Sequence, residues 1–481
     1  MVRLKVALLL GSVICLAGGL ISLNGCGGGT GHGQQPPLSS GKISHVVIIF
    51  QENRSPDNLF HDPVLMNRTP CPGACADIAI QGKTSTGQMV TLQQVPLVTN
   101  YDLGHGHDSF LHACDWNPST GCAMDGADQI GCSPSQDCPT DPQYQYVQAS
   151  DVQPYFTMAE TYTFGDRMFQ TNQGPSFPAH QYIIAGTSAI SEKSTIYAAE
   201  NPGGAQGDAG CLAPVGATVN TMDTSQSDPR TPEGNTDQLC FEHPTLTDLL
   251  DASQLSWKYY TPAAGSIWTG PDAINHMCGP NVPPPGATAC VAPEWTNHVV
   301  IEGRNSQILN DIAAGQLANV SWVIPNAQAS DHAASNDGGG PSWVAAIVNA
   351  IGTSQYWNDT AIIITWDDWG GWYDHQPPPQ VRNSYEYGLR VPLIVISPYA
   401  KPAYISHMTY DFGSILKFVE NVFSLSTIDP AVGYADSYTP NDLSDCFNFS
   451  QTPLGFTQIQ APLGADHFLN NTGPGTGPDN D

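Results

Sequence analysis

The stretch ISHVVIIFQENRS (residues 43–55) is a continuous apolar run that ends in polar residues. A strand with apolar side chains on both faces is typical of the centre of a parallel sheet, where helices cover both sides. The stretch therefore predicts a central strand whose carboxyl end delivers Glu52 and Asn53, and with it an α/β fold.

The C-terminal third of the chain repeats this pattern and adds helices to it. The expected helices cover residues 305–317, 342–357 and 411–423, and the expected strands cover residues 318–325, 360–371 and 390–398. Helical segments that alternate with buried strands predict an α/β domain with a parallel sheet. We expect this domain to span residues 42–460.

Two long segments lack such periodicity. Residues from about 61 to 150 and from about 201 to 300 are rich in cysteine, proline and glycine, so we expect loop or cap insertions there. A helix followed by a strand at residues 245–262 interrupts the second segment. Residues 461–481 end in a glycine- and proline-rich stretch and are expected to form a disordered tail.

The N-terminus has the pattern of an export signal. A short basic start, an apolar run and the sequence LNGC predict a lipoprotein-type signal peptide over residues 1–25, with Cys26 as the lipid site. A flexible tether would follow over residues 26–41. An ordinary cleaved signal or a plain membrane anchor remains an alternative. We expect an exported protein in the periplasm or at the cell surface, in contact with a bacterial membrane through Cys26.

The cysteines are consistent with export. Of 13 cysteines, Cys15 lies in the signal and Cys26 is the lipid site. Ten of the others form close pairs in the sequence, which suits disulfides in an oxidising compartment. The expected pairs are Cys71/Cys75, Cys114/Cys122, Cys132/Cys138, Cys211/Cys240 and Cys278/Cys290, and Cys446 is left unpaired.

The charge of the chain excludes one class of partner. There are 44 acidic and 15 basic residues, for a net charge of −29. Such a chain has no cationic stripe to neutralise phosphates, so we expect no nucleic acid as partner. An anionic substrate would need a local positive centre, and a bound metal ion is the obvious candidate.

Oxygen ligands follow two of the predicted strands. Glu52 and Asn53 come after the first strand, and Asp367 and Asp368 follow the run AIIITW. Binding sites in open parallel sheets lie at the carboxyl ends of strands, where such oxygens can converge on a divalent cation. An acidic pair is also common in turns. The glycines at residues 370–371 favour a site, because glycine lets the backbone approach a ligand closely.

The stretch TNQGPSFPAHQY (residues 171–182) places Ser176 where a helix is expected to begin. Serine is a good N-cap, and the free N–H groups of a helix N-terminus also attract phosphate. A metal that touches the hydroxyl would favour its attacking form. Ser176 is therefore both a candidate cap and a candidate nucleophile.

Four motifs together resemble one family. They are ENRSPDNLF (residues 52–60), QGPSFPAHQY (173–182), WDDWGGWYDHQPPP (366–379) and LRVPLIVISPYAKP (389–402). In this order they resemble the phosphoesterase family of bacterial phospholipases C and acid phosphatases, within the alkaline-phosphatase superfamily. The resemblance spans roughly residues 43–425. It implies a three-layer α/β/α fold with a mainly parallel central sheet, one divalent metal ion, and a Ser or Thr nucleophile that forms a phosphoenzyme.

The resemblance also implies roles for single residues. Ser176 would be the nucleophile and a metal ligand, and the other metal ligands would be Glu52, Asn53, Asp367 and Asp368.

Two histidines are expected beside the phosphate. The segment YDLGHGHDSF aligns His105 with a histidine near the phosphate, and His107 and His112 are close rivals. His332 lies in a loop after a strand, where the family also carries a histidine. Both would bind phosphate or protonate the leaving oxygen. His180 and His375 are expected to orient carboxylates or backbone.

Departures from the family pattern leave the lipid specificity open. Pro56 stands where the lipase members usually carry an aromatic residue, and Ala179 and His180 replace an Asn-Arg pair of the phospholipases. The expected function is an exported, metal-dependent phosphoesterase of the phospholipase C or acid phosphatase type. The alternative is a catalytically inactive, surface-tethered lipoprotein that binds a ligand or glycan through an aromatic face, formed by Trp366, Trp369, Trp372 and Tyr373.

Overall fold

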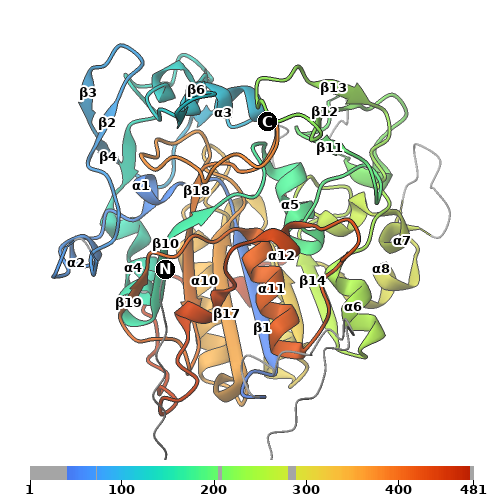
Figure 1. Ribbon diagram of the computed structural model, residues 1–481. Coiled ribbons are helices and arrows are strands. Elements are labelled where there is room, and N and C mark those ends of the chain that lie inside the picture. Colours follow the sequence, from blue (N-terminus) through green and yellow to red (C-terminus); the bar gives the residue numbers. More distant parts are fainter. Residues whose placement is uncertain (1–40, 72, 204–207, 280–288, 477–481) are drawn as a thin grey trace, which may run out of the picture. The chain divides into compact units, whose positions relative to one another are not determined.

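The computed structural model describes residues 41–71, 73–203, 208–279 and 289–476 (Figure 1). The expected signal peptide, Cys26 and nearly all of the tether lie outside the described residues. No helix among the residues described has the length and apolar character that crossing a membrane requires.

An eight-stranded sheet forms the centre of the fold, in the order β15-β14-β16-β1-β17-β18-β10-β19. Its pairs are parallel except those of β18, which runs antiparallel to both β17 and β10. The expected mainly parallel sheet is thus confirmed. The strands are β1 (His45–Gln51), β10 (Thr163–Phe169), β14 (Trp257–Thr261), β15 (Val299–Ile301), β16 (Val320–Val323), β17 (Thr360–Trp366), β18 (Arg390–Ile396) and β19 (Tyr404–Ser406).

Strand β1 is central, as its sequence predicts. It pairs in parallel with β16 and β17, and Ile48 lies opposite Trp322 on one side and Ile363 on the other. Every residue from 46 to 51 is buried. Because neighbours pair with both edges and helices cover both faces, none of these positions faces water, and residues 46–50 are all apolar.

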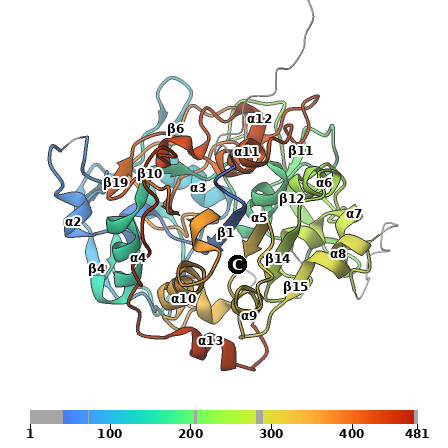
Figure 2. The ribbon, with the colours of Figure 1, turned by 90° about the horizontal axis from the view of Figure 1, so that it is seen from below.

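Helices cover the sheet in two layers. Helices α4, α9 and α10 pack together on one face, and α5, α6 and α11 pack together on the other (Figure 2). This arrangement is the three-layer α/β/α fold that the family resemblance implies. The helices are α4 (Ala149–Thr161), α5 (Ser176–Ala185), α6 (Leu246–Ala252), α9 (Gln307–Ala313), α10 (Gly340–Gly352) and α11 (Phe412–Phe423).

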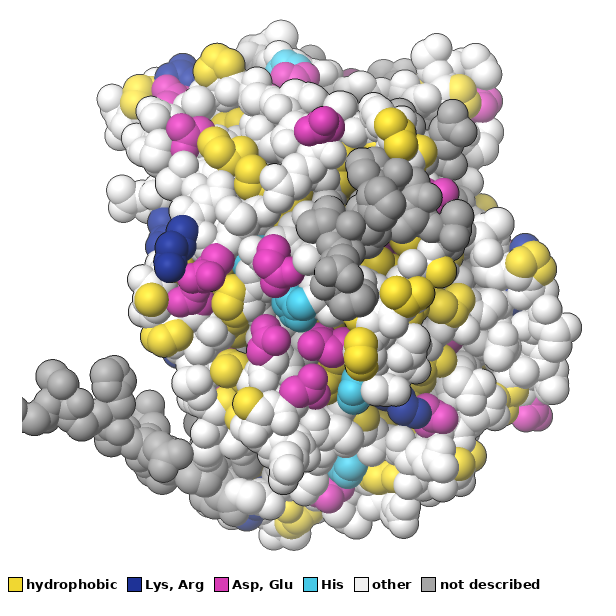
Figure 3. Space-filling view, turned by 90° about the vertical axis from the view of Figure 1, so that its right-hand side faces the viewer, with side chains coloured by type: hydrophobic (Ala, Val, Ile, Leu, Met, Phe, Trp, Pro, Cys, Tyr) yellow, Lys and Arg dark blue, Asp and Glu magenta, His cyan; other side chains and the backbone are white. Residues whose placement is uncertain are grey.

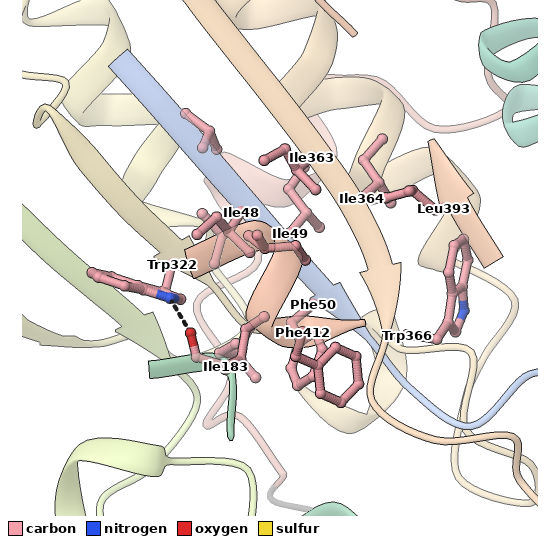
Figure 4. Close-up of a cluster of buried hydrophobic side chains, with 14 of the residues drawn as sticks. Ile48, Ile49, Phe50, Ile183, Trp322, Ile363, Ile364, Trp366, Leu393 and Phe412 are labelled. Atoms are coloured by element: carbon pink, nitrogen blue, oxygen red, sulfur yellow. Dashed lines mark hydrogen bonds between the residues drawn. The ribbon is translucent and has the colours of Figure 1, made fainter. Parts of the chain in front are cut away.

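Apolar side chains of the sheet and the helices interlock in the core (Figure 4). The indole N–H of Trp322 donates to the Ile183 carbonyl oxygen at 3.1 Å, which ties β16 to α5. Phe50 meets Phe412 of α11 edge to face, with ring centroids 5.2 Å apart. Burying one such side chain contributes about 1.5–3 kcal/mol, so these contacts help to fix α5 on β16 and α11 on β1.

Short elements of the first cysteine-rich segment lie above the end of the sheet at which β1 ends (Figure 1). They are α1 (Pro56–Leu59), α2 (Pro63–Met66), β2 (Gln81–Lys83), β3 (Met89–Thr91), β4 (Gln93–Val95), β5 (Asp102–Leu103), α3 (His107–Cys114), β6 (Trp116–Asn117), β7 (Gly121–Cys122), β8 (Cys132–Ser133) and β9 (Gln145–Val147).

The second segment divides between this region and the core. Strands β11 (Ile196–Ala198), β12 (Val219–Asp223) and β13 (Gly234–Thr236) form a small sheet of their own. Strands β14 and β15, by contrast, belong to the central sheet. The insertion is therefore shorter than expected, because the helix and strand at residues 245–262 are part of the main fold. The short helices α7 (Asn275–Cys278), α8 (Pro293–His298) and α12 (Ala435–Tyr438) complete this side.

All five predicted disulfides are present. They join Cys71 to Cys75, Cys114 to Cys122, Cys132 to Cys138, Cys211 to Cys240 and Cys278 to Cys290. Cys446 is free and buried, as expected. Four of the five bonds lie in two small hydrophobic clusters of these segments, where they add a covalent link to a modest core.

The C-terminal tail differs from the prediction. Helix α13 (Ala465–Asn470) lies in the segment that was expected to be disordered. Phe468 is buried, and its carbonyl oxygen accepts a hydrogen bond from the Ser306 N–H at 2.9 Å. The expectation is therefore wrong for residues 465–470, because one aromatic anchor outweighs the polar composition around it.

The surface carries the negative charge that the composition implies. On the face shown in Figure 3, acidic side chains outnumber lysines and arginines. On this face the acidic character of the chain is therefore displayed to solvent.

Candidate active site

The four predicted metal ligands from the strand ends come together at one edge of the sheet. Gln51 of β1 pairs with Trp366 of β17, so the next residues, Glu52 and Asp367, leave the sheet side by side. The Asn53 N–H donates to Asp367 Oδ1 at 2.9 Å. The side chains of Glu52, Asn53, Asp367 and Asp368 are all fully buried.

Backbone groups hold one oxygen of each aspartate. Asp367 Oδ1 also accepts from the Asp368 N–H at 2.7 Å, and Asp368 Oδ1 accepts from the Gly370 N–H at 2.7 Å. Gly370 has a φ of +64°, and a Cβ there would collide with the Asn53 carbonyl oxygen. The glycine is needed because two loops pack closely here, rather than because a ligand approaches the backbone.

The outer oxygens of the four side chains make no hydrogen bond. Buried atoms without a hydrogen bond are found on all four: Glu52 Oε2, Asn53 Oδ1, Asp367 Oδ2 and Asp368 Oδ2. An unsatisfied buried polar atom costs about 1–3 kcal/mol, and more when it is charged. A set of hard oxygens left in this way is what a divalent cation requires, so the residues fit the metal that the family resemblance implies.

The charges of the site lead to the same conclusion. Burial raises the pKa of Glu52 well above its usual value, and the neighbouring carboxylates of Asp367 and Asp368 raise it further. The pKa of Asp368 is raised by burial and then by Asp367. Within the described residues, the salt bridges of these carboxylates are with His180 alone. A bound cation would offset this mutual repulsion.

Ser176 is the first residue of α5 and is buried. The N-cap of the helix is Pro175, not Ser176, and no side chain caps the helix at that position. The expected capping role is therefore wrong, because the helix begins at Ser176 itself, one residue earlier than a serine cap would require. The Phe177 N–H is instead bonded to Asn201 Oδ1 at 3.0 Å.

His180 lies one helical turn after Ser176 and faces the acidic residues. Its Nε2 is 3.2 Å from Glu52 Oε1 and 3.9 Å from Asp367 Oδ2. Burial lowers the pKa of His180 to about 4, although Asp367 works in the other direction. The imidazole is thus neutral and suited to metal binding as well as to the expected orientation of a carboxylate. We did not predict His180 as a ligand; its spacing of four residues from Ser176 was the signal available.

His105 and His332 lie close to each other, with ring centroids 5.9 Å apart. His105 Nδ1 bonds to the Leu103 carbonyl oxygen at 2.8 Å, which leaves Nε2 to accept from Asn53 Nδ2 at 3.1 Å. His332 Nδ1 lies 2.7 Å from the Ala333 carbonyl oxygen. Both imidazoles lower the pKa of Asp368, against the larger effects of its burial and of Asp367, so both lie near the ligand group.

The other histidines lie elsewhere. His107 Nδ1 is 3.0 Å from Glu233 Oε1, and the His112 side chain is 42% exposed on α3. Of the three rivals, His105 is therefore the one that contacts a predicted ligand. His375 contacts the carboxylates of Asp57 and Asp77.

The aromatic residues do not form a binding face. Trp366, Trp369 and Trp372 are fully buried, and Tyr373 is 5% exposed. They pack the two loops that follow β1 and β17. The alternative of an aromatic ligand-binding surface at these residues is therefore wrong.

The chain belongs to the phosphoesterase family, whose model matches residues 43–426. It is 22% identical over 459 residues to the non-hemolytic phospholipase C of Pseudomonas aeruginosa, covering 85% of this chain and 57% of that protein. Identity to the hemolytic phospholipase C of the same organism is 23%, with 89% and 59% covered. Phospholipase C A of Mycobacterium tuberculosis is 29% identical over 167 residues, 30% of this chain and 32% of that protein. The chain thus spans less than two thirds of these relatives.

Similar solved structures are distant. Murine ectonucleotide pyrophosphatase/phosphodiesterase 5 has a TM-score of 0.36 at 8% identity, covering 62% of this chain and 94% of that one. A protein in the alkaline phosphatase superfamily from Vibrio parahaemolyticus has a TM-score of 0.32 at 10% identity, covering 83% and 71%. These likenesses are too slight to bear on function.

Proposed function

We propose that the protein is a metal-dependent phosphoesterase that hydrolyses phosphate esters through a phosphoserine at Ser176. The observation that carries this proposal is the set of four buried, unpartnered oxygens at the ends of β1 and β17. Membership of the phosphoesterase family supports it. The names of the relatives favour phospholipase C, and acid phosphatase is the other reaction type that the family resemblance implies.

The metal would be held by Glu52, Asn53, Asp367 and Asp368, with the Ser176 hydroxyl as a further ligand. A divalent cation bound there would favour the alkoxide form of Ser176 and withdraw charge from the phosphoryl oxygens. The proposal names one metal ion and leaves its identity open.

The chain's own residues carry the remaining steps. Ser176 Oγ attacks phosphorus, and the ester oxygen leaves on the opposite side. His105 and His332 bind phosphoryl oxygens or protonate the leaving oxygen. Their proximity to each other and the contact of His105 with Asn53 support these roles. Water then attacks the phosphoserine and frees Ser176. Fixed charges and dipoles in a buried site supply most of the rate in phosphoryl transfer.

Export belongs to the same proposal. Five disulfides suit an oxidising compartment, and the N-terminal pattern suits lipidation at Cys26. The mass of the membrane-bound protein's N-terminal peptide would show whether Cys26 carries lipid.

The experiment compares turnover of 4-nitrophenyl phosphate and of phosphatidylcholine from acidic to neutral pH, with and without a chelator. We expect chelator-sensitive turnover of at least one substrate, and its loss in Ser176→Ala. The matched control is Ser321→Ala, because Ser321 is also buried and its hydroxyl makes no hydrogen bond, but it lies within β16. Substantial activity of Ser176→Ala would remove Ser176 as the nucleophile, and turnover that resists the chelator would remove the metal.

A further inference from the structure

Histidine and acidic side chains gather on the face of the molecule that Figure 3 shows. Three of them come from neighbouring short helices: Asp248 of α6, His276 of α7 and Glu294 of α8, here the His276 cluster. Each offers one potential metal-ligating atom, and these three atoms lie within 4.8 Å of one another. The His276 cluster shares no residue with the candidate active site.

A fourth residue, Glu242, sets the orientation of the imidazole of His276. His276 Nδ1 donates to Glu242 Oε1 at 2.8 Å. Because an ionised carboxylate can only accept, Nδ1 carries the proton, and in the neutral imidazole Nε2 has a free lone pair. A carboxylate behind a histidine is common at metal sites, since it fixes the tautomer and makes the other nitrogen a better ligand. His276 is therefore prepared to bind a cation through Nε2.

Two carboxylate oxygens face this nitrogen. Asp248 Oδ1 lies 3.7 Å from His276 Nε2, and Glu294 Oε2 lies 4.0 Å from it. Both separations are too long for hydrogen bonds. Ligand atoms that share one zinc ion at about 2.1 Å lie about 3.4 Å apart, so an ion between these three atoms needs only small shifts of the side chains.

The converging atoms are left without other partners. His276 Nε2 and Glu294 Oε2 are buried atoms that make no hydrogen bond within the described residues, although their side chains are 24% and 25% exposed. Asp248 Oδ2 accepts the Thr245 N–H at the start of α6 at 2.8 Å. This cap holds the carboxylate in place and leaves Oδ1 as the oxygen that faces His276.

A protonated His276 would offset part of the negative charge, but it accounts for less of the geometry. Its Nε2–H would have no acceptor, since neither oxygen is within hydrogen-bond distance. In the described part of the chain, the salt bridges of Glu242, Asp248 and Glu294 are with His276 alone, so three carboxylates share one base. Burial raises the pKa of Glu294 to about 7, His276 acts to lower it, and Asp248 raises it further. A bound cation accounts for both the unsatisfied atoms and the excess of negative charge.

We propose that the His276 cluster is a second metal site, which binds a zinc ion through His276 Nε2, Asp248 Oδ1 and Glu294 Oε2. One imidazole with two carboxylates favours zinc, whereas calcium and magnesium take oxygen ligands. Since its ligands are partly exposed, this site holds its ion less tightly than the buried site at Glu52. It fills only at higher free zinc and empties in metal-free buffer. The inference does not depend on the proposed function.

The ion has a structural role in this proposal. Helices α7 and α8 have four and six residues, and helices this short are not stable in isolation. The disulfide between Cys278 and Cys290 links the end of α7 to the segment before α8. A zinc ion at the His276 cluster adds a second link between these helices and extends it to α6.

The test is equilibrium dialysis of the full-length protein against a series of free Zn²⁺ concentrations at neutral pH, with the bound metal counted by elemental analysis. We expect the Kd of one zinc ion to rise at least about tenfold in His276→Gln, because a ligand is lost, while any other bound zinc is unchanged. Glu294→Gln should weaken the same ion by at least about tenfold. The same dialysis with Ca²⁺ should give binding at least about tenfold weaker than zinc at this site.

The matched control is His112→Gln. His112 is also partly exposed, and its Nδ1 also lies 3.7 Å from a carboxylate, Asp108 Oδ2, but no second carboxylate of the described residues lies within 4.0 Å. This variant should bind zinc as the unmodified protein does. Near-ultraviolet circular dichroism in chelator shows whether each variant is folded, and if His276→Gln is not, Glu294→Gln decides by the same criterion.

The outcomes are distinct. Equal zinc binding by the unmodified protein and His276→Gln would overturn the site. An equal loss in His112→Gln would do so as well, since any surface histidine would then bind the ion. Calcium bound more tightly than zinc would overturn the choice of metal. Because dialysis counts ions and not turnover, none of these results depends on the chemistry at Ser176.

Discussion

Two groups of carboxylates and histidines are built mainly from the loops after β1 and β17. They differ in whether the carboxylate oxygens already have partners. The first, here the Glu52 cluster, consists of Glu52, His180 and Asp367. The second, here the Asp57 network, consists of Asp57, Asp374 and His375. In each, the potential metal-ligating atoms lie within 4.8 Å of one another. By residue type and spacing, both are candidate metal sites.

The Asp57 network already has its cations. Arg390 Nε donates to both carboxylate oxygens of Asp374 at 3.0 Å, and Arg390 Nη2 donates to Asp57 Oδ1 at 3.1 Å. His375 Nδ1 donates to Asp57 Oδ2 at 2.7 Å, and its Nε2 donates to Asp77 Oδ1 at 3.1 Å. Every oxygen of the two buried carboxylates thus has a partner.

The Glu52 cluster has no such partners. Glu52 Oε2 and Asp367 Oδ2 are buried without a hydrogen bond, and its one basic residue, His180, is neutral at physiological pH. The number of acidic residues therefore does not identify a metal site. Several converging carboxylate oxygens that lack a hydrogen bond favour such a site, because a bound cation would offset the cost of burying them.

The largest expected effect comes from Asp367→Asn. Loss of a ligand should reduce kcat/KM by about a thousandfold or more, since metal ions commonly contribute several kcal/mol to charge stabilisation. In a chelator, however, the variant should unfold at a higher temperature than the unmodified protein, because one of the mutually repelling carboxylates is gone. Steady-state kinetics and thermal unfolding in chelator check both. A lower melting temperature for Asp367→Asn than for the unmodified protein in chelator would contradict the view that these carboxylates repel one another.

Arg390→Met should have the opposite effect on stability. Removing one partner of a buried ion pair costs about 3–5 kcal/mol, because the other charges stay buried and uncompensated. Urea unfolding measures the loss. Lys193→Met is the control, since Lys193 and its partner Glu192 are 77% and 48% exposed and their pair should contribute about 1 kcal/mol or less. A similar small loss for both variants would show that the Asp57 network is not held by Arg390.

A divalent cation should stabilise the protein through the Glu52 cluster and not through the Asp57 network. At a free concentration one hundred times its Kd, a divalent cation should add about 2.7 kcal/mol to the free energy of unfolding. Thermal shift with and without metal should show this gain in the unmodified protein and in His375→Gln, but not in Asp367→Asn. If His375→Gln lost the gain and Asp367→Asn kept it, the metal would belong to the Asp57 network.

The last expected effect is a pH dependence of stability. Although burial acts to lower it, hydrogen bonds and charges from Asp57 and Asp77 raise the pKa of His375 to about 10. A pKa raised in the folded state stabilises fully below the unfolded value of about 6.5, and the stabilisation is lost as pH rises toward 10. Urea unfolding at several pH values should show this decline, and His375→Gln should reduce it. An equal slope in both proteins would mean that His375 is not charged.

Much of this arrangement follows from local sequence, and some of it does not. The apolar runs of β1 and β17 specify central strands, so the meeting of the carboxylates at their ends could be predicted from the chain alone. The disulfides followed from short separations. The place of β14 in the central sheet could not be inferred, because it depends on pairing with β16 across a long segment without periodicity.

Nor could the partners of each carboxylate be predicted from the sequence. Asp368 and Asp374 lie in one motif, and only the fold brings Arg390 to Asp374 and leaves Asp368 Oδ2 unsatisfied. Charge complementarity between distant segments is a property of the folded chain.

The most direct test of the metal site is elemental analysis of the purified protein beside two variants, after dialysis against metal-containing and then metal-free buffer. We expect one divalent ion per chain in the unmodified protein and in His375→Gln, and none in Asp367→Asn. Metal retained by Asp367→Asn, or absent from the unmodified protein, would contradict the assignment of the Glu52 cluster as the metal site.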